Sequence, residues 1–145
     1  MSKTVKELLQ NKNGDVWTIS PQASAYEALQ FMAEKDIGAL LVAENNKLVG
    51  VFSERDYARK VTLKGKSSKT AAVRELMTTK VLYVSPDKTV DECMALMTEK
   101  HIRHLPVLDA GSLVGIVTIG DVVKSVVADQ KFIIQELEKY IAGAV

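Results

Sequence analysis

Residues 48–56 read Leu-Val-Gly-Val-Phe-Ser-Glu-Arg-Asp, and residues 113–121 read Leu-Val-Gly-Ile-Val-Thr-Ile-Gly-Asp. The two stretches lie 65 positions apart, and at this offset the chain aligns with itself without a gap, from residues 16–61 onto residues 81–126. Self-similarity at a fixed spacing indicates a repeated structural unit. The sequence therefore predicts two copies of one unit within 145 residues.

Each copy shows the same order of local patterns. Runs rich in β-branched and aromatic residues, 16–19 and 81–84, predict strands that end at a Ser-Pro pair, because proline cannot donate to a ladder. A hydroxyl-x-x-Glu pattern then predicts a capped helix, two short apolar runs predict a hairpin, and a last helix begins near Ser53 or Thr118. The capped starts are Ser24-Ala25-Tyr26-Glu27 and Thr89-Val90-Asp91-Glu92, and the hairpin strands are expected over 40–43 with 48–52 and over 105–108 with 113–117.

The order strand, helix, strand, strand, helix thus occurs twice, which predicts an α+β fold of two tandem repeats. Because a three-stranded unit has a narrow core of its own, we expect the copies to pack with pseudo-two-fold symmetry into one module. By sequence, residues 1–61 hold an N-terminal helix and the first repeat, 62–72 a polar linker, 73–127 the second repeat, and 128–145 an extension of a long C-terminal helix. An apolar stripe on this helix is expected to pack on a second chain or across the module, and it contains Phe132, Ile133, Leu137, Tyr140 and Ile141.

Composition and charge narrow the class of protein. Hydrophobic residues make up 47% and charged residues 26% of the chain, and the formal net charge is +1, as in an ordinary globular protein. No apolar run approaches the roughly 20 residues of a membrane span, and a single cysteine, Cys93, excludes an internal disulfide. We expect a cytoplasmic protein in which Cys93 is a buried, inert thiol. The lysines of the linker are expected to be solvated rather than to bind nucleic acid.

The repeated strings resemble those of a CBS-domain pair, also called a Bateman module. The resemblance rests on residues 102–109, Ile-Arg-His-Leu-Pro-Val-Leu-Asp, followed by the string at 113–121, and on looser versions at 37–42 and 48–56. It covers nearly the whole chain and implies a stand-alone regulatory protein that catalyses no reaction. Adenosine nucleotides commonly lie between the repeats in this family. The resemblance also implies a homodimer. Because nothing else in the chain looks like an effector domain, any regulated partner is expected to be a separate protein.

The resemblance implies a nucleotide site in each of two clefts, formed by the hydroxyl-x-x-Asp of one copy and the first two strands of the other. The first site is expected to contain Ser53, Arg55, Asp56, Lys80, Val81, Leu82, Ile102, Arg103 and His104. The second site is expected to contain Val16, Trp17, Ile37, Gly38, Ala39, Thr118, Gly120 and Asp121.

These residue types suit a nucleotide. A carboxylate such as Asp56 accepts hydrogen bonds from both ribose hydroxyls, and a helix N-terminus beside Ser53 presents unpaired amide donors to phosphate. Arg103 can hold phosphate oxygens bidentately, and His104 donates more strongly when protonated. Because residues 38–39 are Gly-Ala where the first site has Arg-His, we expect the first site to prefer charged phosphates. The second is expected to take adenosine-like or less charged groups, or to stay empty.

The same residues also have structural interpretations. The two hydroxyl-x-x-Asp motifs are ordinary helix caps with an acid in the first turn. Arg103 and His104 also suit the exposed end of a strand, and Trp17 suits a core. His101 and His104 have no second pair at metal spacing, so no zinc site is expected.

Three classes of function fit the sequence to different degrees. The leading hypothesis is a sensor that binds an adenine compound (AMP, ADP, ATP, NAD or S-adenosylmethionine) and acts on a separate partner by shifting a conformational population. The alternative is a ligand-free CBS scaffold for dimerisation or protein–protein interaction. An enzyme is disfavoured, because the sequence has no P-loop, G-x-G-x-x-G motif, nucleophile elbow or paired catalytic carboxylates with a supporting base. No catalytic residue, catalytic cofactor or metal is therefore expected.

Overall fold

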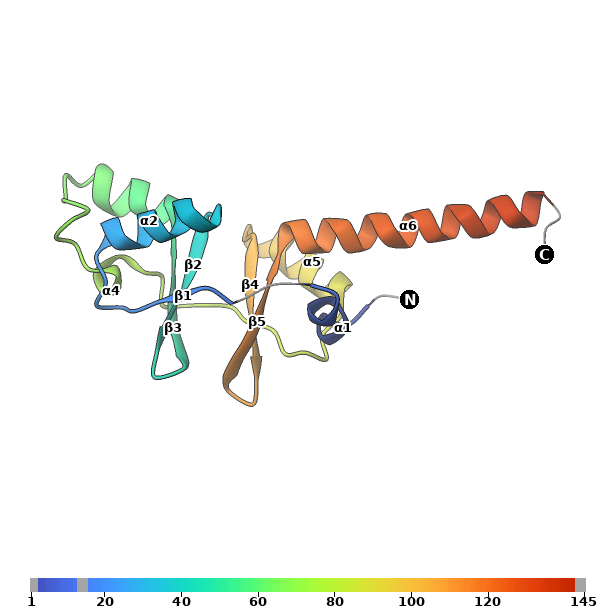
Figure 1. Cartoon of the computed structure of the whole chain (residues 1–145), viewed down its shortest axis with the longest axis horizontal. Helices are drawn as coiled ribbons and strands as arrows, with labels where there is room; N and C mark the ends of the chain where they lie inside the picture. Colours follow the sequence, from blue (N-terminus) through green and yellow to red (C-terminus); the bar gives the residue numbers. More distant parts are fainter. Residues whose placement is uncertain (1–2, 13–15, 143–145) are drawn as a thin grey trace. The chain divides into compact units, whose positions relative to one another are not determined.

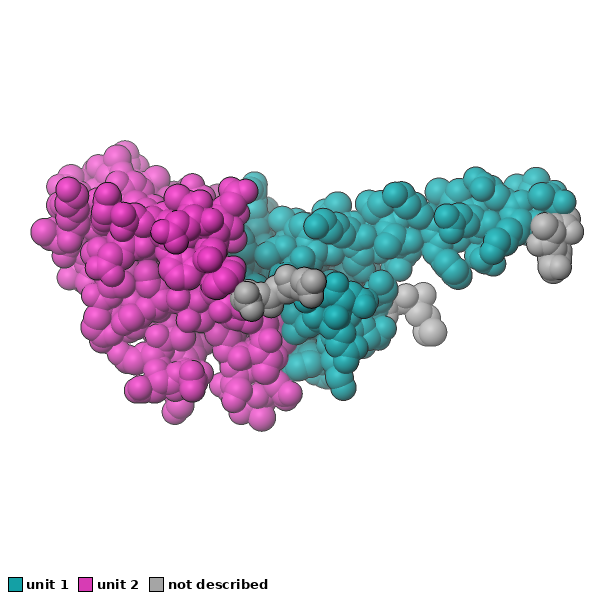
Figure 2. Space-filling view, in the orientation of Figure 1, with its two compact units in different colours: residues 1–14, 84–105, 116–145 teal, residues 15–83, 106–115 magenta. Residues whose placement is uncertain are grey.

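The computed structural model describes residues 3–12 and 16–142. In chain order the elements are α1 (Val5–Gln10), β1 (Thr18–Ile19), α2 (Ala25–Lys35), β2 (Ala39–Glu44), β3 (Lys47–Ser53), α3 (Glu54–Tyr57), a π-helical turn η1 (Ala58–Thr62), α4 (Val73–Leu76), α5 (Val90–Lys100), β4 (His104–Asp109), β5 (Ser112–Thr118) and α6 (Ile119–Ile141) (Figure 1). The chain divides into two compact units: unit 1 is residues 1–14, 84–105 and 116–145, and unit 2 is residues 15–83 and 106–115 (Figure 2). This order confirms the predicted α+β class and the long C-terminal helix.

The first repeat builds a three-stranded sheet in the order β1-β2-β3. β1 pairs parallel with β2, and β2 pairs antiparallel with β3 in the predicted hairpin, with Leu40 opposite Phe52. At the start of α2 the Ser24 hydroxyl accepts a hydrogen bond from the Glu27 amide, as the capping pattern predicts. The core that joins α2 to the sheet contains Ala25, Ala28, Met32, Leu40, Val42, Phe52, Val61, Ala71, Val73 and Leu76.

The second repeat keeps the helix and the hairpin. Thr89 and Glu92 form a complete capping box at the start of α5, and β4 pairs with β5. The strand predicted over 81–84 was wrong, because within the described chain only Val84 forms a β-bridge there, and Leu82 and Tyr83 are 40% and 59% exposed. β-propensity is realised only where a neighbouring strand supplies a ladder. In the first copy β2 does so, although only for Thr18 and Ile19 of the predicted 16–19.

The short helix before each repeat packs on the helix start of the other repeat. In unit 1, the Val5 amide donates to Lys88 O (2.7 Å), the Val90 amide donates to Lys3 O (2.8 Å), and Thr4 and Thr89 form a β-bridge. α1 therefore packs with the second repeat, although sequence order groups it with the first.

The mirror of this exchange occurs in unit 2, at the segment that enters α4. The Ala25 amide donates to Ala71 O (2.9 Å), the Val73 amide donates to Ala23 O (2.8 Å), and Ser24 bridges Ala72. α4 therefore packs with the first repeat. The segment boundaries predicted from the sequence, at residues 61, 72 and 127, stay predictions.

The polar segment 62–72 is anchored along the first repeat. The Lys66 amide donates to Val61 O (2.9 Å), the Tyr26 amide donates to Ser68 O (2.9 Å), and the Lys69 ammonium lies 5.6 Å from the centre of the Tyr26 ring. These bonds give the segment a defined path rather than the freedom of an unattached linker.

The helix α6 is amphipathic along its length. Its start is capped by Thr118, and its first turns bury Val122 and Ser125, whereas residues 130–142 are all exposed. The predicted stripe is thus exposed, with Ile133 and Leu137 at 56% and 55%, and it does not pack across the described part of its own chain. Within that part, no helix combines the length and apolar character needed to cross a bilayer.

The two hairpin turns generate a test of local strain. Ala110 has φ +50° in the turn between β4 and β5, a conformation that costs an L-residue with a Cβ about 1–2 kcal/mol. Asn45 occupies the equivalent position of the β2–β3 turn with φ +54°, and asparagine tolerates this region. We expect Ala110→Asn to raise the free energy of unfolding by about 0.5–1 kcal/mol and Asn45→Ala to lower it, measured by thermal and denaturant unfolding. Shifts of the same sign in the two variants, or a lower free energy of unfolding in Ala110→Asn, would contradict this account.

Candidate functional site

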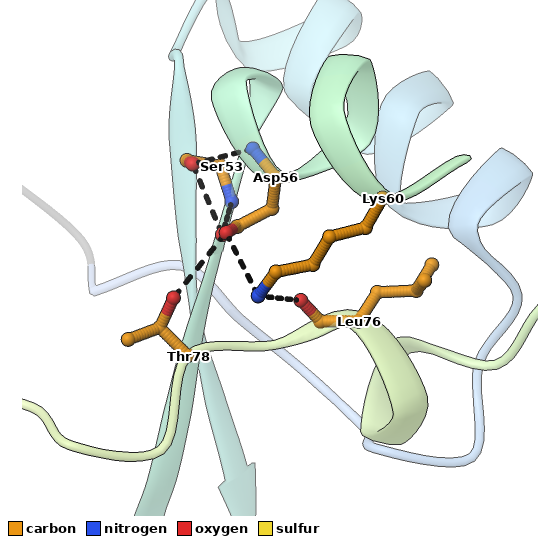
Figure 3. Close-up of polar contacts among 5 residues, drawn as sticks. All are labelled: Ser53, Asp56, Lys60, Leu76 and Thr78. Carbon is orange, nitrogen blue, oxygen red and sulfur yellow. Dashed lines mark hydrogen bonds and ion pairs between the residues drawn. The ribbon is translucent and has the colours of Figure 1, made fainter. Parts of the chain in front are cut away.

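The first candidate site centres on Asp56, at the junction of β3 and α3 (Figure 3). One carboxylate oxygen, Oδ2, accepts hydrogen bonds from the Ser53 amide (2.9 Å) and hydroxyl (3.0 Å). The other, Oδ1, accepts a hydrogen bond from the Thr78 hydroxyl (3.3 Å) and lies 3.2 Å from the Lys60 ammonium. Lys60 also donates to Leu76 O at 2.9 Å. Asp56 is only 9% exposed, and a buried carboxylate is costly unless it has hydrogen-bond or ionic partners. Here the chain itself supplies those partners to both carboxylate oxygens.

A close backbone contact brings Thr78 to Asp56. The Val51 amide donates to Thr78 O (3.0 Å) and the Thr78 amide donates to Val51 O (2.9 Å), so the segment after α4 pairs with β3. Gly50 permits this approach, because a Cβ there would lie 2.9 Å from Thr78 O and 2.7 Å from the Met77 sulfur. The site thus requires a glycine in the strand beside it.

The second candidate site centres on Asp121, at the junction of β5 and α6 in unit 1. Thr118 and Asp121 form the same capping box, with the Thr118 amide donating to Asp121 Oδ2 at 2.9 Å. The Lys12 ammonium lies 2.7 Å from the same oxygen and donates to Ile116 O at 2.9 Å. Burial alone would raise the pKa of Asp121, but the bonds from Lys12 and Thr118 outweigh it and lower that pKa below its ordinary value. The aspartate is therefore ionised at neutral pH.

His104 lies within the electrostatic influence of this cluster. Burial lowers the pKa of His104, the positive charges of Lys12 and Arg103 lower it further, and only Asp121 opposes them. The imidazole is therefore neutral at pH 7 in this structure, rather than the protonated donor considered from the sequence. His104 was assigned to the first site and Asp121 to the second, and unit 1 brings the two within range of one another.

The remaining residues predicted for the first site are distributed over both units. In unit 2, Arg55, Lys80 and Leu82 are exposed and Val81 is half-buried. In unit 1, Ile102 is half-buried, and Arg103 is exposed while its carbonyl accepts the Ile119 amide at 2.9 Å. Assembly of these residues around one ligand stays a prediction.

The apolar residues predicted for the second site belong to unit 2. The Trp17 ring meets Phe31 edge-on, with centroids 5.8 Å apart, and the Lys35 ammonium lies 4.3 Å from the Trp17 ring centre. One face of Trp17 is therefore occupied by a cation–π contact. Gly38 O accepts the Glu54 amide at 3.1 Å. Val16 and Ile37 are half-buried, Ala39 is buried, and Gly120 in unit 1 is exposed. Their assembly with Thr118 and Asp121 also stays a prediction.

Three residues that contact the aspartates were missed by the sequence analysis. Lys60 follows Asp56 by four positions on one helical path, so the i,i+4 spacing could have found it. Thr78 and Lys12 lie 22 and 109 positions from their aspartates, and no local pattern predicts such contacts. In the repeat alignment Lys60 corresponds to position 125, which is a serine. The second repeat therefore has no lysine at that helical position, and the lysine on Asp121 comes from another segment.

Two further expectations concern thiol and metal chemistry. Cys93 is fully buried in α5, and burial raises the pKa of its thiol, with the nearby charge of Glu92 adding to the effect. Its interpretation as a buried residue is confirmed. Within residues 3–12 and 16–142, no group of three or more His, Cys, Asp or Glu side chains is placed to hold a metal ion.

Comparisons with known proteins identify the class. The CBS domain model matches residues 5–62 and 73–128, so the chain belongs to the CBS-domain family as a pair of CBS domains. A CBS-domain protein of Burkholderia ambifaria MC40-6 has the same fold, with a TM-score of 0.84 and 52% identity over 88% of this chain and 96% of that one. The mitochondrial CBS-domain-containing protein CBSX3 of Arabidopsis thaliana is 36% identical over 98% of this chain and 73% of its own length. A hexameric CBS-CP12 protein from bloom-forming cyanobacteria has a TM-score of 0.73 at 28% identity, covering 85% of this chain and 71% of that one.

Membership of the family sets the general function. CBS-domain proteins are generally regulatory, ligand-binding modules, and those that stand alone are regulatory rather than catalytic. CBS domains commonly bind adenosine-containing ligands. These findings confirm the predicted membership of the CBS-domain family and the predicted α+β fold of two tandem repeats with a long C-terminal helix.

The Lys12–Asp121 pair generates a pH-dependent prediction. Because the folded-state pKa of Asp121 is lowered, its contribution is fully present above the unfolded value of about 3.9 and is lost as pH falls through the folded value. Lys12→Met should lower the free energy of unfolding at pH 7 by about 1–3 kcal/mol and flatten its decline below about pH 4.

The matched control for Lys12→Met is Lys88→Met. Lys88 pairs with Glu92 at 3.6 Å with both side chains about half exposed, and exposed pairs contribute about 0–1 kcal/mol. The free energy of unfolding of both variants would be measured by denaturant unfolding across pH. If both lose the same amount, the Lys12–Asp121 contact contributes no more to stability than an exposed ion pair.

His104 generates a second pH-dependent prediction in a different window. Since folding lowers its pKa, the unfolded chain binds the proton more tightly, and stability falls as pH drops below the unfolded value of about 6.5. We expect His104→Gln to reduce the loss of melting temperature between pH 7 and pH 5. An unchanged loss in the variant would show that His104 is not the group responsible.

Proposed function

We propose that this chain is a regulatory sensor that binds an adenine compound and acts on a separate effector protein. The candidates are AMP, ADP, ATP, NAD and S-adenosylmethionine, with no catalytic step on any of them. The observation that carries the proposal is the same in both repeats: a hydroxyl-x-x-Asp box at a strand–helix junction, with a lysine ammonium on the carboxylate.

This arrangement supplies the two groups that a nucleotide needs. A carboxylate is a strong acceptor for a pair of ribose hydroxyls. An ammonium that leaves the carboxylate when those hydroxyls arrive becomes a donor for phosphate. Lys12 and Arg103 both act on His104, so positive charge gathers beside Asp121 in unit 1. The second site therefore has a cation of its own, and we propose that it too accepts phosphate-bearing ligands.

Regulation follows from linkage between ligand and conformation. A nucleotide that replaces the lysine at an aspartate favours the arrangement in which that lysine is released. At about one hundred times its Kd, such a ligand would stabilise the bound form by about 2.7 kcal/mol. The predicted homodimer, the pseudo-two-fold packing of the repeats and the cytoplasmic location belong to this proposal, and the Arabidopsis relative is mitochondrial.

Calorimetric titration tests the proposal. AMP, ADP, ATP, NAD and S-adenosylmethionine, with GTP as the non-adenine comparison, would be titrated into the parent protein, Asp56→Ala and Asp121→Ala. We expect at least one adenine compound to bind, and one or both substitutions to weaken it at least tenfold, because the ribose loses a charged acceptor.

Glu92→Ala is the matched control. Glu92 is the acid of a complete capping box at the start of α5, outside both candidate sites, so its loss removes a cap and no ligand contact. Equal weakening in all three variants would assign Asp56 and Asp121 to helix capping alone. Thermal unfolding of each variant separates lost binding from lost structure.

One observation favours the alternative of a ligand-free scaffold. The Asp56 carboxylate is 9% exposed and both of its oxygens are already engaged by Ser53, Thr78 and Lys60. A carboxylate whose oxygens are both engaged in this way can serve a structural role without contacting a ligand. Folded parent protein that binds none of the adenine compounds would favour the scaffold.

A further inference from the structure

The C-terminal part of α6 has an exposed face that its own chain leaves uncovered. Residues 130–142 are all exposed, and in Figure 1 this part of the helix runs on beyond α5, against which its first turns pack. An isolated helix of this length is marginal in water, and helices gain most of their stability from packing an apolar face. Exposed apolar stripes of this size on a soluble helix indicate an interface.

The apolar residues of this face follow a heptad repeat. Positions 123, 127, 130, 134, 137 and 141 alternate in steps of four and three, as the a and d positions of a coiled coil do. Five of the six are apolar and exposed, and they are Val123, Val127, Ile134, Leu137 and Ile141. β-branched residues occupy the a positions 127, 134 and 141, with Gln130 as the one polar residue of the seam. This seam points away from the buried side of α6, where Val122 and Ser125 lie.

We propose that α6 pairs with α6 of a second copy of this chain as an antiparallel two-stranded coiled coil. The seam is self-complementary, because antiparallel alignment about residue 132 places Val123 against Ile141 of the partner helix and Val127 against its Leu137. This contact is additional to the homodimer suggested by family resemblance, and it does not depend on nucleotide binding.

The charges beside the seam favour the antiparallel orientation. Lys124, Lys131 and Glu138 occupy the e positions, which face one another in an antiparallel pair. Each end of the contact therefore gains a Lys124–Glu138 ion pair, and Lys131 lies opposite its own copy at the centre, so two attractive pairs stand against one repulsive pair. Neither Lys124 nor Glu138 has an ion pair within the described chain. In a parallel pair Lys124 would face Ile119, Lys131 would face Val126 and Glu138 would face Ile133, and no such ion pair would form.

The charge of the helix also argues for a second copy over a membrane surface. Between residues 123 and 141 the three lysines 124, 131 and 139 balance the three acids 129, 136 and 138. Helices that lie on anionic membranes carry an excess of lysine and arginine on the polar face. A neutral polar face gives no such attraction.

The test compares Leu137→Glu with Gln135→Glu in the full chain. Both substitutions add one carboxylate to the same exposed turn, but residue 137 lies in the seam and residue 135 lies on the opposite face. By light scattering after size exclusion, Leu137→Glu should halve the molar mass, from dimer to monomer or from tetramer to dimer, and Gln135→Glu should leave it unchanged. Because both side chains are exposed and lie outside the core of either repeat, cooperative thermal unfolding should show that the two repeats stay folded in both variants. An unchanged mass in Leu137→Glu, or an equal fall in both variants, would overturn the pairing.

Disulfide formation tests the orientation. In the antiparallel pair, the double variant Val127→Cys with Leu137→Cys should give a covalent dimer under mild oxidation, and neither single variant should. Cross-linking of Leu137→Cys alone would place like residues opposite one another and would overturn the antiparallel arrangement. The molar-mass and disulfide tests do not involve a nucleotide, so a parent protein that binds no nucleotide would not change their outcome. The helix pairing and the proposed function can therefore be contradicted independently of one another.

Discussion

A carboxylate three residues after a strand-ending hydroxyl ties each repeat together. In both copies the aspartate caps the following helix through its capping box, and at the same time accepts a lysine ammonium. A buried or half-buried carboxylate is costly unless such partners surround it. The carboxylate therefore holds three elements in contact: the strand that ends at the hydroxyl residue, the helix that follows, and the segment that carries the lysine. The other contacts of each site lie around this carboxylate.

The two repeats meet this requirement by different routes. Around Asp56 the lysine comes from the same helical path, and the segment after α4 adds Thr78 through its pairing with Val51. Around Asp121 the lysine comes from the segment after α1, because the helical position that corresponds to Lys60 is Ser125. The hydroxyl of Ser125 is buried and has no partner within the described chain. The exchange of α1 and α4 between the repeats thus has a chemical consequence, since it delivers Thr78 to one aspartate and Lys12 to the other.

The sequence predicted the parts of the fold that depend on local patterns. Capped helix starts, hairpins and helix faces follow from spacing within a few residues, and these predictions held at Ser24, Thr89, Ser53 and Thr118. The strand over 81–84 failed because strand formation depends on a distant neighbour, and Leu82 and Tyr83 have the composition of a strand without one. The same limit applies to the site. Asp56 and Asp121 were found from the motif, whereas Thr78 and Lys12 reach them through contacts between segments far apart in the chain.

The position of Asp121 suggests how a ligand could change more than its own site. A nucleotide that takes the carboxylate would release Lys12, whose segment follows α1, and α1 is bonded in turn to residues 86 and 88. Asp121 also lies in the first turn of α6, the helix that carries the exposed heptad seam. A ligand shifts an equilibrium only by its differential affinity for the two states, so its influence depends on what the lysine contact stabilises. Since that contact joins the N-terminal segment to the base of α6, the binding energy would act on the element that we propose pairs with a second copy.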